Sequence, residues 1–180
     1  FSASQPQLRY GNVMLDASLI NPTLSQPLSV IENIKVEGGK GAEILTFHEA
    51  LQHKKLQEHF MKVLNAEDYF TSFHLAYINN GIVVCIPKDT TSSTLKITRG
   101  GTNSISHVIV IAEPHSNVDI VDLALSPSEG YQSHCTEIIA QEGSHIRYAT
   151  LQNLSQHASH FSARKALVSK QASVDWMECH

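Results

Sequence analysis

The sequence lacks an excess of basic residues and a long apolar run. Its 180 residues include 13 Lys and Arg against 17 Asp and Glu, which gives a net charge of −4. No surplus of positive charge can neutralise the phosphates of a nucleic acid, so a nucleic-acid partner is not expected. The longest apolar runs, Ile82 to Ile86 and Val108 to Ala112, are five residues each. A helix that spans a bilayer needs about 20 apolar residues, so no membrane segment is expected.

Cysteine is also scarce. The three cysteines, Cys85, Cys135 and Cys179, have an irregular spacing that fits neither a disulfide framework nor a set of zinc ligands. This usage is typical of a reducing compartment, so a cytoplasmic location is expected. The sequence opens without a recognisable signal peptide, although residue 1 is Phe rather than Met and the native start is expected to lie elsewhere. Histidine is abundant by contrast, with 11 residues.

Residues 1–80 carry the helix signals and are expected to form a small α/β region. Thr46 and Glu49 are spaced for a capping box, in which the threonine hydroxyl accepts the backbone N–H of the glutamate. Apolar residues then recur at helical spacing, which predicts one bent helix or two short ones near residues 46–64. A second helix is predicted near residues 67–78, before an Asn-Asn-Gly stop.

Residues 81–180 repeat with an offset of 28 residues. Apolar columns flank a column that is polar in every unit, which is the alternation of a strand with one inward and one outward face. Three inward columns are predicted: Ile82, Val110, Ile138 and Ala166; Ser92, Ile120, Tyr148 and Trp176; Leu95, Leu123, Leu151 and Cys179. Short strands at a fixed period predict a mainly β fold, a right-handed parallel β-helix. Residues 81–180 are expected to form its first three to four coils, truncated within the fourth.

One stretch of the sequence resembles a known family. Phe73-His-Leu-Ala-Tyr77, followed by Gly81-Ile82 and Ile86-Pro-Lys88, resembles the helix-to-strand junction of the SufB/SufD family of iron–sulfur cluster assembly scaffolds. His48-Glu-Ala-Leu51 is similar to the helical lead-in of SufD-type members. SufB-type members often carry an N-terminal cysteine cluster, and the absence of cysteine before Cys85 favours the SufD type. The chain is thereby identified as an N-terminal fragment of such a protein.

This resemblance implies a non-catalytic scaffold subunit. It implies as partners a SufB-like subunit and a SufC-like ABC ATPase, and it is compatible with a homodimer through the β-helix. The iron–sulfur cluster is assembled by the parent complex, and the functional cysteines and histidines of the family lie in later coils. The resemblance therefore implies no cofactor bound by this segment and no catalytic residue within it.

Four residues are weak candidates for metal ligands: His134, Cys135, Cys179 and His180. Thiolate and imidazole both bind iron and zinc. The repeat places Cys179 in an inward column, which predicts a buried apolar thiol. His134 and Cys135 are predicted to lie at the end of a loop, and Cys85 is predicted to face outward. The simpler interpretation is that each of these side chains has a structural role and binds no metal.

Several histidines could form a metal patch on the side of the stacked loops. The candidates are His107, His115, His145, His157 and His160. Ligation requires three or four groups that converge on one point, together with partners that orient them. Only the last pair is close in sequence, so solvated loop histidines are the favoured interpretation.

The alternative function is a carbohydrate-active β-helix, either a polysaccharide lyase or a glycan-binding module. Asp119, Arg147 and Asp175 share an outward column, and a lyase needs a basic residue beside carboxylates to move a proton. Cross-coil ion pairing explains the same column equally well. A glycan site should also show outward aromatic residues, whereas Tyr148 and Trp176 fall in an inward column.

Overall fold

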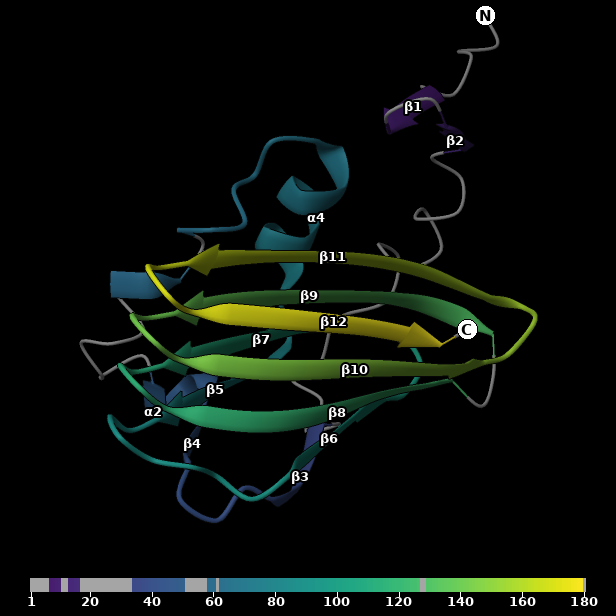
Figure 1. The fold of residues 1–180 in the computed structure, drawn as a ribbon. Helices are drawn as coiled ribbons and strands as arrows, with labels where there is room; N and C mark the ends of the chain where they lie inside the picture. The colour runs from purple at the N-terminus through teal and green to yellow at the C-terminus, as the bar shows by residue number, and fades with distance from the viewer. Residues whose placement is uncertain are drawn as a thin grey trace, which may run out of the picture.

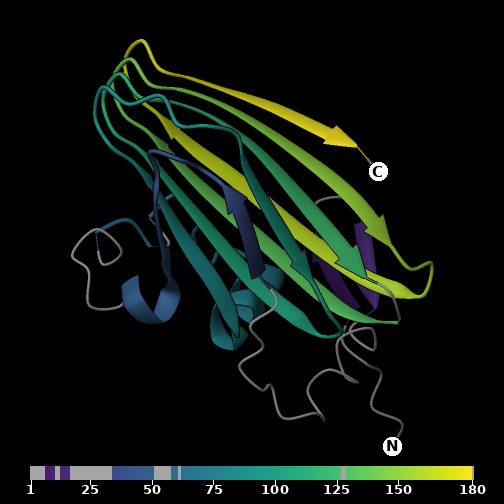
Figure 2. The same ribbon diagram turned by 90° about the horizontal axis from the view of Figure 1, so that it is seen from below.

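Two sheets face each other, and within each sheet the strands of successive coils run parallel, which makes the fold a β-helix (Figure 1). The structure is a computed structural model, and it describes residues 7–10, 13–16, 34–50, 58–60, 62–126 and 129–179. Each coil contributes one strand to each sheet, and the four coils are the strand pairs β5–β6, β7–β8, β9–β10 and β11–β12. Viewed from below, the sheets form two layers that run alongside each other (Figure 2). The mainly β fold and the parallel β-helix predicted from the repeat are confirmed.

The two sheets have five strands each. The first, called here the covered sheet, contains β4 (Glu43–Thr46), β5 (Asn80–Ile86), β7 (Ser104–Ala112), β9 (Gly130–Ala140) and β11 (Ala158–Val168). The second sheet contains β3 (Ile34–Gly38), β6 (Leu95–Gly100), β8 (Asn117–Ser126), β10 (His145–Leu154) and β12 (Ser173–Cys179). A separate antiparallel pair consists of β1 (Gln7–Tyr10) and β2 (Val13–Asp16).

The first coil is extended by two strands that precede it in the sequence. β3 pairs antiparallel with β6, and β4 pairs antiparallel with β5. Ile34, Val36 and Ile44 pack against the apolar core between the sheets. Residues 34–46 therefore add one strand to each sheet of the β-helix.

The 28-residue offset holds from the second coil onward but not in the first. Val110 pairs with Ile138, which pairs in turn with Ala166, as predicted. Ile82, however, pairs with Val108, an offset of 26 residues. Side chains alternate with a period of two along a strand, so this slip of two residues leaves the same side chains inward. The alternation of apolar and polar residues therefore cannot distinguish an offset of 26 residues from one of 28.

The prediction that Leu123, Leu151 and Cys179 point inward is wrong. Along β8 the inward side chains are those of Val118, Ile120, Asp122, Ala124 and Ser126, all of which are buried. Leu123 follows Ile120 by three residues, an odd number, so it lies on the opposite face of the sheet. Leu151 is 42% exposed and Cys179 is also exposed. Leu95 is buried because it pairs with Ile120 rather than with Leu123.

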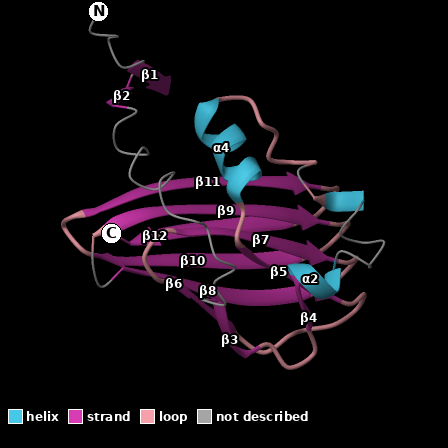
Figure 3. Ribbon diagram, turned by 180° about the vertical axis from the view of Figure 1, so that it is seen from behind, coloured by secondary structure: helices cyan, strands magenta, loops and turns pink. Residues whose placement is uncertain are grey.

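The helices lie on the outer face of the covered sheet (Figure 3). α4 (Tyr69–Tyr77) falls within the helix predicted near residues 67–78, and its N-cap Asp68 accepts the backbone N–H of Thr71 at 2.8 Å. α2 (Phe47–Ala50) begins at the predicted capping box, in which Glu49 N–H donates to Thr46 Oγ1 at 3.3 Å. The rest of the helix predicted near 46–64 lies partly outside the described residues. Within the part of the chain described, the helices fall short of the length and apolar character of a membrane span.

Substitutions in β8 test which face is inward. Ile120→Ala should lower the free energy of unfolding by about 2–5 kcal/mol, because it opens a cavity in the core. Leu123→Ala, on the opposite face, should cost less than about 1 kcal/mol. Urea unfolding of both variants measures the difference. Equal losses would contradict the assignment of the two faces.

Candidate functional site

The covered sheet has no face in contact with water along β7. Every residue of β7 is buried, as is every residue of β9 after Gly130. The inner face of the sheet packs on the core between the sheets, and the outer face packs beneath residues of α2 and α4 and beneath Phe60 and Val63. Cys85 faces outward from the coils as predicted, but it is covered by this outer cluster and is only 1% exposed.

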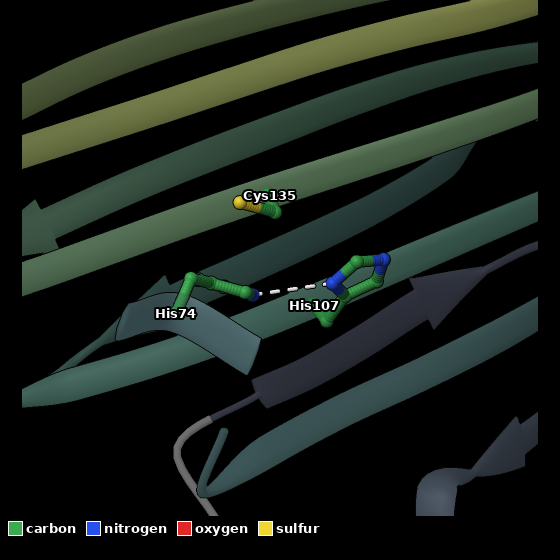
Figure 4. Close-up of side chains that lie close together, drawn as sticks. All are labelled: His74, His107 and Cys135. Carbon is green, nitrogen blue, oxygen red and sulfur yellow. Dashed lines mark hydrogen bonds between the residues drawn. The ribbon is translucent and has the colours of Figure 1, made fainter. Parts of the chain in front are cut away.

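Three potential metal ligands meet beneath α4. His74 comes from α4, His107 from β7 and Cys135 from β9, and each is fully buried. Their ligating atoms all lie within 4.8 Å of one another (Figure 4). His74 Nε2 lies 3.1 Å from His107 Nδ1. Three segments far apart in the sequence therefore present two imidazoles and one thiol to one point.

Each imidazole is held by a second partner on its other nitrogen. Nδ1 of His74 lies 2.7 Å from Ser133 Oγ, and Nε2 of His107 lies 3.0 Å from Glu137 Oε1. The other carboxylate oxygen of Glu137 accepts the backbone N–H groups of Val63 and Leu64 at 2.8 and 2.9 Å. One carboxylate thus connects the segment before α4 to the histidines and the sheet.

The hydrogen bonds of this cluster are consistent with one proton arrangement. The ionised Glu137 is an acceptor only, so His107 donates to it from Nε2 and its Nδ1 is left as an acceptor. His74 then donates from Nε2 to His107, and its own Nδ1 accepts the hydroxyl proton of Ser133. The cluster is therefore a continuous chain of hydrogen bonds with every member satisfied.

Burial sets the charges of this chain. It lowers the pKa of His74 well below its usual value, and neighbouring His107 and Arg99 add to the effect. It also lowers the pKa of His107, although the hydrogen bond to Glu137 opposes the shift. For Glu137 burial favours the neutral acid, but the hydrogen bonds from His107 and Leu64 outweigh it and lower the pKa. At neutral pH both imidazoles are neutral and the carboxylate is ionised.

Cys135 lies in the apolar part of the site. It packs with Leu64 and Ala163, and burial raises the pKa of its thiol to about 12. The sulfur is therefore protonated at neutral pH while nothing else is bound. Two aromatic rings close the site beside His107, because Phe47 and Phe60 lie with ring centroids 5.8 and 5.4 Å from the imidazole.

A second buried polar network lies on the inner side of the covered sheet. Arg99 Nε donates to Asp122 Oδ1 at 2.9 Å, and a second ion-pair contact joins Arg99 Nη2 to the same carboxylate. Tyr148 donates its hydroxyl proton to Asp122 at 2.6 Å, and Arg99 also donates to Thr136 Oγ1 at 3.0 Å. Burial opposes the charge of Arg99, but Asp122 and Tyr148 reverse this effect and raise its pKa. Arg99 Nη1 donates to the backbone carbonyl of Cys135 at 3.2 Å, so the two networks share that residue.

Among the metal candidates predicted from the sequence, the three that the structure describes do not converge. His134 and Cys135 lie within β9 rather than at the end of a loop, and successive residues of a strand point to opposite faces. His134 points inward, where its Nδ1 lies 3.3 Å from His160 Nε2, while Cys135 points toward α4. Cys179 is exposed in β12, and His180 lies outside the described residues.

His74, His107 and Glu137 were not recognised as site residues from the sequence. His74 follows Phe70 by four residues, which places the two on one face of a helix, and both are buried. Glu137 lies between Cys135 and Ile139 at intervals of two residues, so the three share one face of β9. His107 was interpreted as a surface residue, but it precedes an apolar run and lies within β7. These spacings are visible in the sequence. They did not lead to the site because a loop, rather than a strand, was predicted at residue 134.

The outward column is a ladder of charged side chains in which Arg147 pairs with Asp119. Asp119, Arg147 and Asp175 are neighbours on β8, β10 and β12, as the repeat predicted. Arg147 Nε donates to Asp119 Oδ1 at 2.6 Å. The three residues line an open groove of about 340 Å³, whose other lining residues are Thr91, Ser92, Asn117, Val118, His145 and Ser173.

Comparison with known proteins finds a family match within these coils. Residues 95–180 match the family described as SUF system FeS cluster assembly, SufBD core domain. The chain is similar to the iron–sulfur cluster assembly protein SufD of Bacillus subtilis, with 27% identity over 161 residues, covering 83% of this chain and 36% of the relative. An iron–sulfur cluster assembly SufBD family protein of Staphylococcus haemolyticus is 22% identical over 131 residues, covering 68% of this chain and 28% of the relative. The chain thus spans about a third of the length of these curated relatives.

Substitution of Glu137 tests the chain of hydrogen bonds. Glu137→Ala should lower the free energy of unfolding by about 3 kcal/mol or more, because three donors lose their acceptor in a buried site. Glu137→Gln keeps one oxygen for the N–H groups of Val63 and Leu64 and should cost about 1–2 kcal/mol. Chemical denaturation measures both losses. Similar losses for the two variants would show that the oxygen acceptor is unimportant.

Acid should destabilise the fold through its buried histidines. The pKa of His74, His107 and His134 is lowered from 6.5, chiefly by burial. A group whose pKa is lower in the folded state stabilises the fold above its unfolded pKa, and this stability is lost as the pH falls. Below pH 6.5, each histidine should therefore lower the free energy of unfolding by up to about 1.4 kcal/mol for each unit that the pH falls.

Urea unfolding between about pH 7.5 and pH 5 measures this slope. His134→Gln should reduce it, because one buried imidazole is removed. The control His157→Gln changes an exposed turn residue and should leave the slope unchanged. Constant stability across this pH range would refute the assignment of neutral buried histidines.

Proposed function

We propose that this chain, whose residues 95–180 match the SufBD core domain, is a member of the SufB/SufD family and part of a scaffold subunit for iron–sulfur cluster assembly. The observation that carries the proposal is the coincidence of this match with the stacked coils, since it begins at β6 and runs to the end of β12. The relative from Bacillus subtilis named SufD favours a SufD-like subunit. Iron and sulfide are then the substrates of the parent complex.

The subunit is proposed to be non-catalytic. The buried ionisable groups described above are paired with one another: Arg99 with Asp122, and His107 with Glu137. Such pairs fix the positions of strands and helices, and their charges are satisfied within the fold. This use of polar groups supports a role in holding partners rather than in turning over a substrate.

The partners proposed are a SufB-like subunit and a SufC-like ABC ATPase. A parallel β-helix suits such a role because its coils present long, regular surfaces and its strands can pair with strands of another chain. The comparisons match only about a third of each relative, so the surfaces that meet these partners are proposed for the whole protein rather than assigned to residues of this chain.

The carbohydrate-active alternative receives no specific support from the outward groove. Arg147 donates to Asp119 within the ladder, so the basic group that a lyase would use is engaged by a carboxylate. The residues that line the groove include no aromatic side chain for stacking on a sugar ring. Cross-coil pairing therefore accounts for the ladder.

Co-expression of the full-length protein tests the scaffold role. The tagged protein should co-purify with its SufB-like and SufC-like partners as one species in size-exclusion chromatography. An ABC ATPase from an unrelated transporter serves as the control and should not be retained. A homodimer that retains neither partner would contradict the proposal.

Binding to an acidic polysaccharide tests the carbohydrate-active alternative. The proposal expects no measurable affinity for the wild-type protein. Affinity that is lost on Asp119→Asn and Asp175→Asn would instead support the carbohydrate-active alternative.

A further inference from the structure

We propose that His74, His107 and Cys135 form a buried binding site for a divalent transition-metal ion of the zinc class. The three ligating atoms lie within 4.8 Å of one another. The site joins α4 to the outer face of β7 and β9, and neither the family match nor the relatives assign it. It goes beyond the scaffold role, and it stands or falls independently of that role.

The ligand types and their spacing suit such an ion. Zinc takes imidazole nitrogen at about 2.0–2.1 Å and thiolate sulfur at about 2.3 Å in tetrahedral geometry. Two nitrogens bound to one tetrahedral ion are then about 3.3 Å apart. His74 Nε2 and His107 Nδ1 are already 3.1 Å apart, so the pair needs almost no rearrangement. The sulfur of Cys135 lies within 4.8 Å of both nitrogens and completes the set by a shift of at most about 1.3 Å.

The outer partners of the two imidazoles are those that metal-binding histidines use. A ligating histidine usually donates its other ring N–H to a carboxylate, a carbonyl or a similar acceptor, which fixes the ring and raises its basicity. Glu137 accepts from Nε2 of His107, and Ser133 faces Nδ1 of His74. Both nitrogens that face the proposed ion are thus oriented from behind by residues of β9.

The protons balance in a defined way when the ion binds. Cys135 loses its thiol proton to solvent and becomes a thiolate. His74 moves its proton from Nε2 to Nδ1 and donates it to Ser133, whose hydroxyl turns to accept it. His107 keeps its proton on Nε2, donated to Glu137. One proton is released per ion, and no electron is transferred.

The ion would connect separate parts of the fold and keep one coordination position open. Three ligands from the described part of the chain leave one position of a tetrahedral ion open. The ion would cross-link α4 to two coils of the β-helix, so binding should oppose separation of the helix from the sheet.

Metal content of the full-length protein tests the site. Protein produced with added zinc and washed with a weak chelator should retain about one zinc more per chain than Cys135→Ser, by mass spectrometry. His107→Gln should lose the same ion. The matched control is Cys85→Ser, which alters another buried cysteine of the covered sheet outside the cluster and should retain it.

A spectroscopic measurement on the wild-type protein tests the site without relying on variants that could misfold. Cobalt in place of zinc should give a thiolate-to-cobalt charge-transfer band and the visible bands of a tetrahedral ion. Titration in buffers of different ionisation enthalpy should show release of about one proton per ion. Equal zinc content in wild type and Cys135→Ser, or no thiolate band in folded wild-type protein, would overturn the proposal. None of these readouts depends on assembly with the Suf partners.

Discussion

The exclusion of water from both faces of β7 and β9 determines most of the architecture around them. A buried polar group without a partner costs free energy, so a carboxylate buried on these strands needs donors from the protein. Glu137 meets this requirement by accepting two backbone N–H groups from the segment before α4 and one from His107. The same bonds dock that segment onto the sheet. Polar burial therefore positions α4, and α4 in turn supplies His74.

The fold was predictable from the sequence because it depends on a short-range rule. Alternation along a strand identified the inward positions of Ile138 and Ala166, and the stacking of identical columns followed. The same rule also explains the errors. A slip of two residues at Ile82 is invisible to alternation, whereas the step of three from Ile120 to Leu123 reverses the face. Turn lengths in the first coil set these registers, and the apolar pattern does not record them.

The candidate site was predictable only in part, because it depends on docking between distant segments. Cys135 was named as a candidate, but its sequence neighbour His134 points to the other side of the sheet. Its actual neighbours, His74 and His107, come from a helix and from the preceding coil. Local spacing could show that His74 shares a helix face with Phe70. It could not show which strands that face would cover.

The pair formed by Arg99 and Asp122 gives the β-helix a property that simple solenoids lack. Arg99 lies in the first coil, Asp122 in the second and Tyr148 in the third, and all three side chains are buried together. In a repeat array with contacts only between neighbours, folding can begin anywhere and spread one unit at a time. Here Arg99 of the first coil also donates to Thr136 of the third, so the cost of burying its charge is compensated only when the second and third coils are both in place. The first three coils are thus expected to fold and unfold as one cooperative unit.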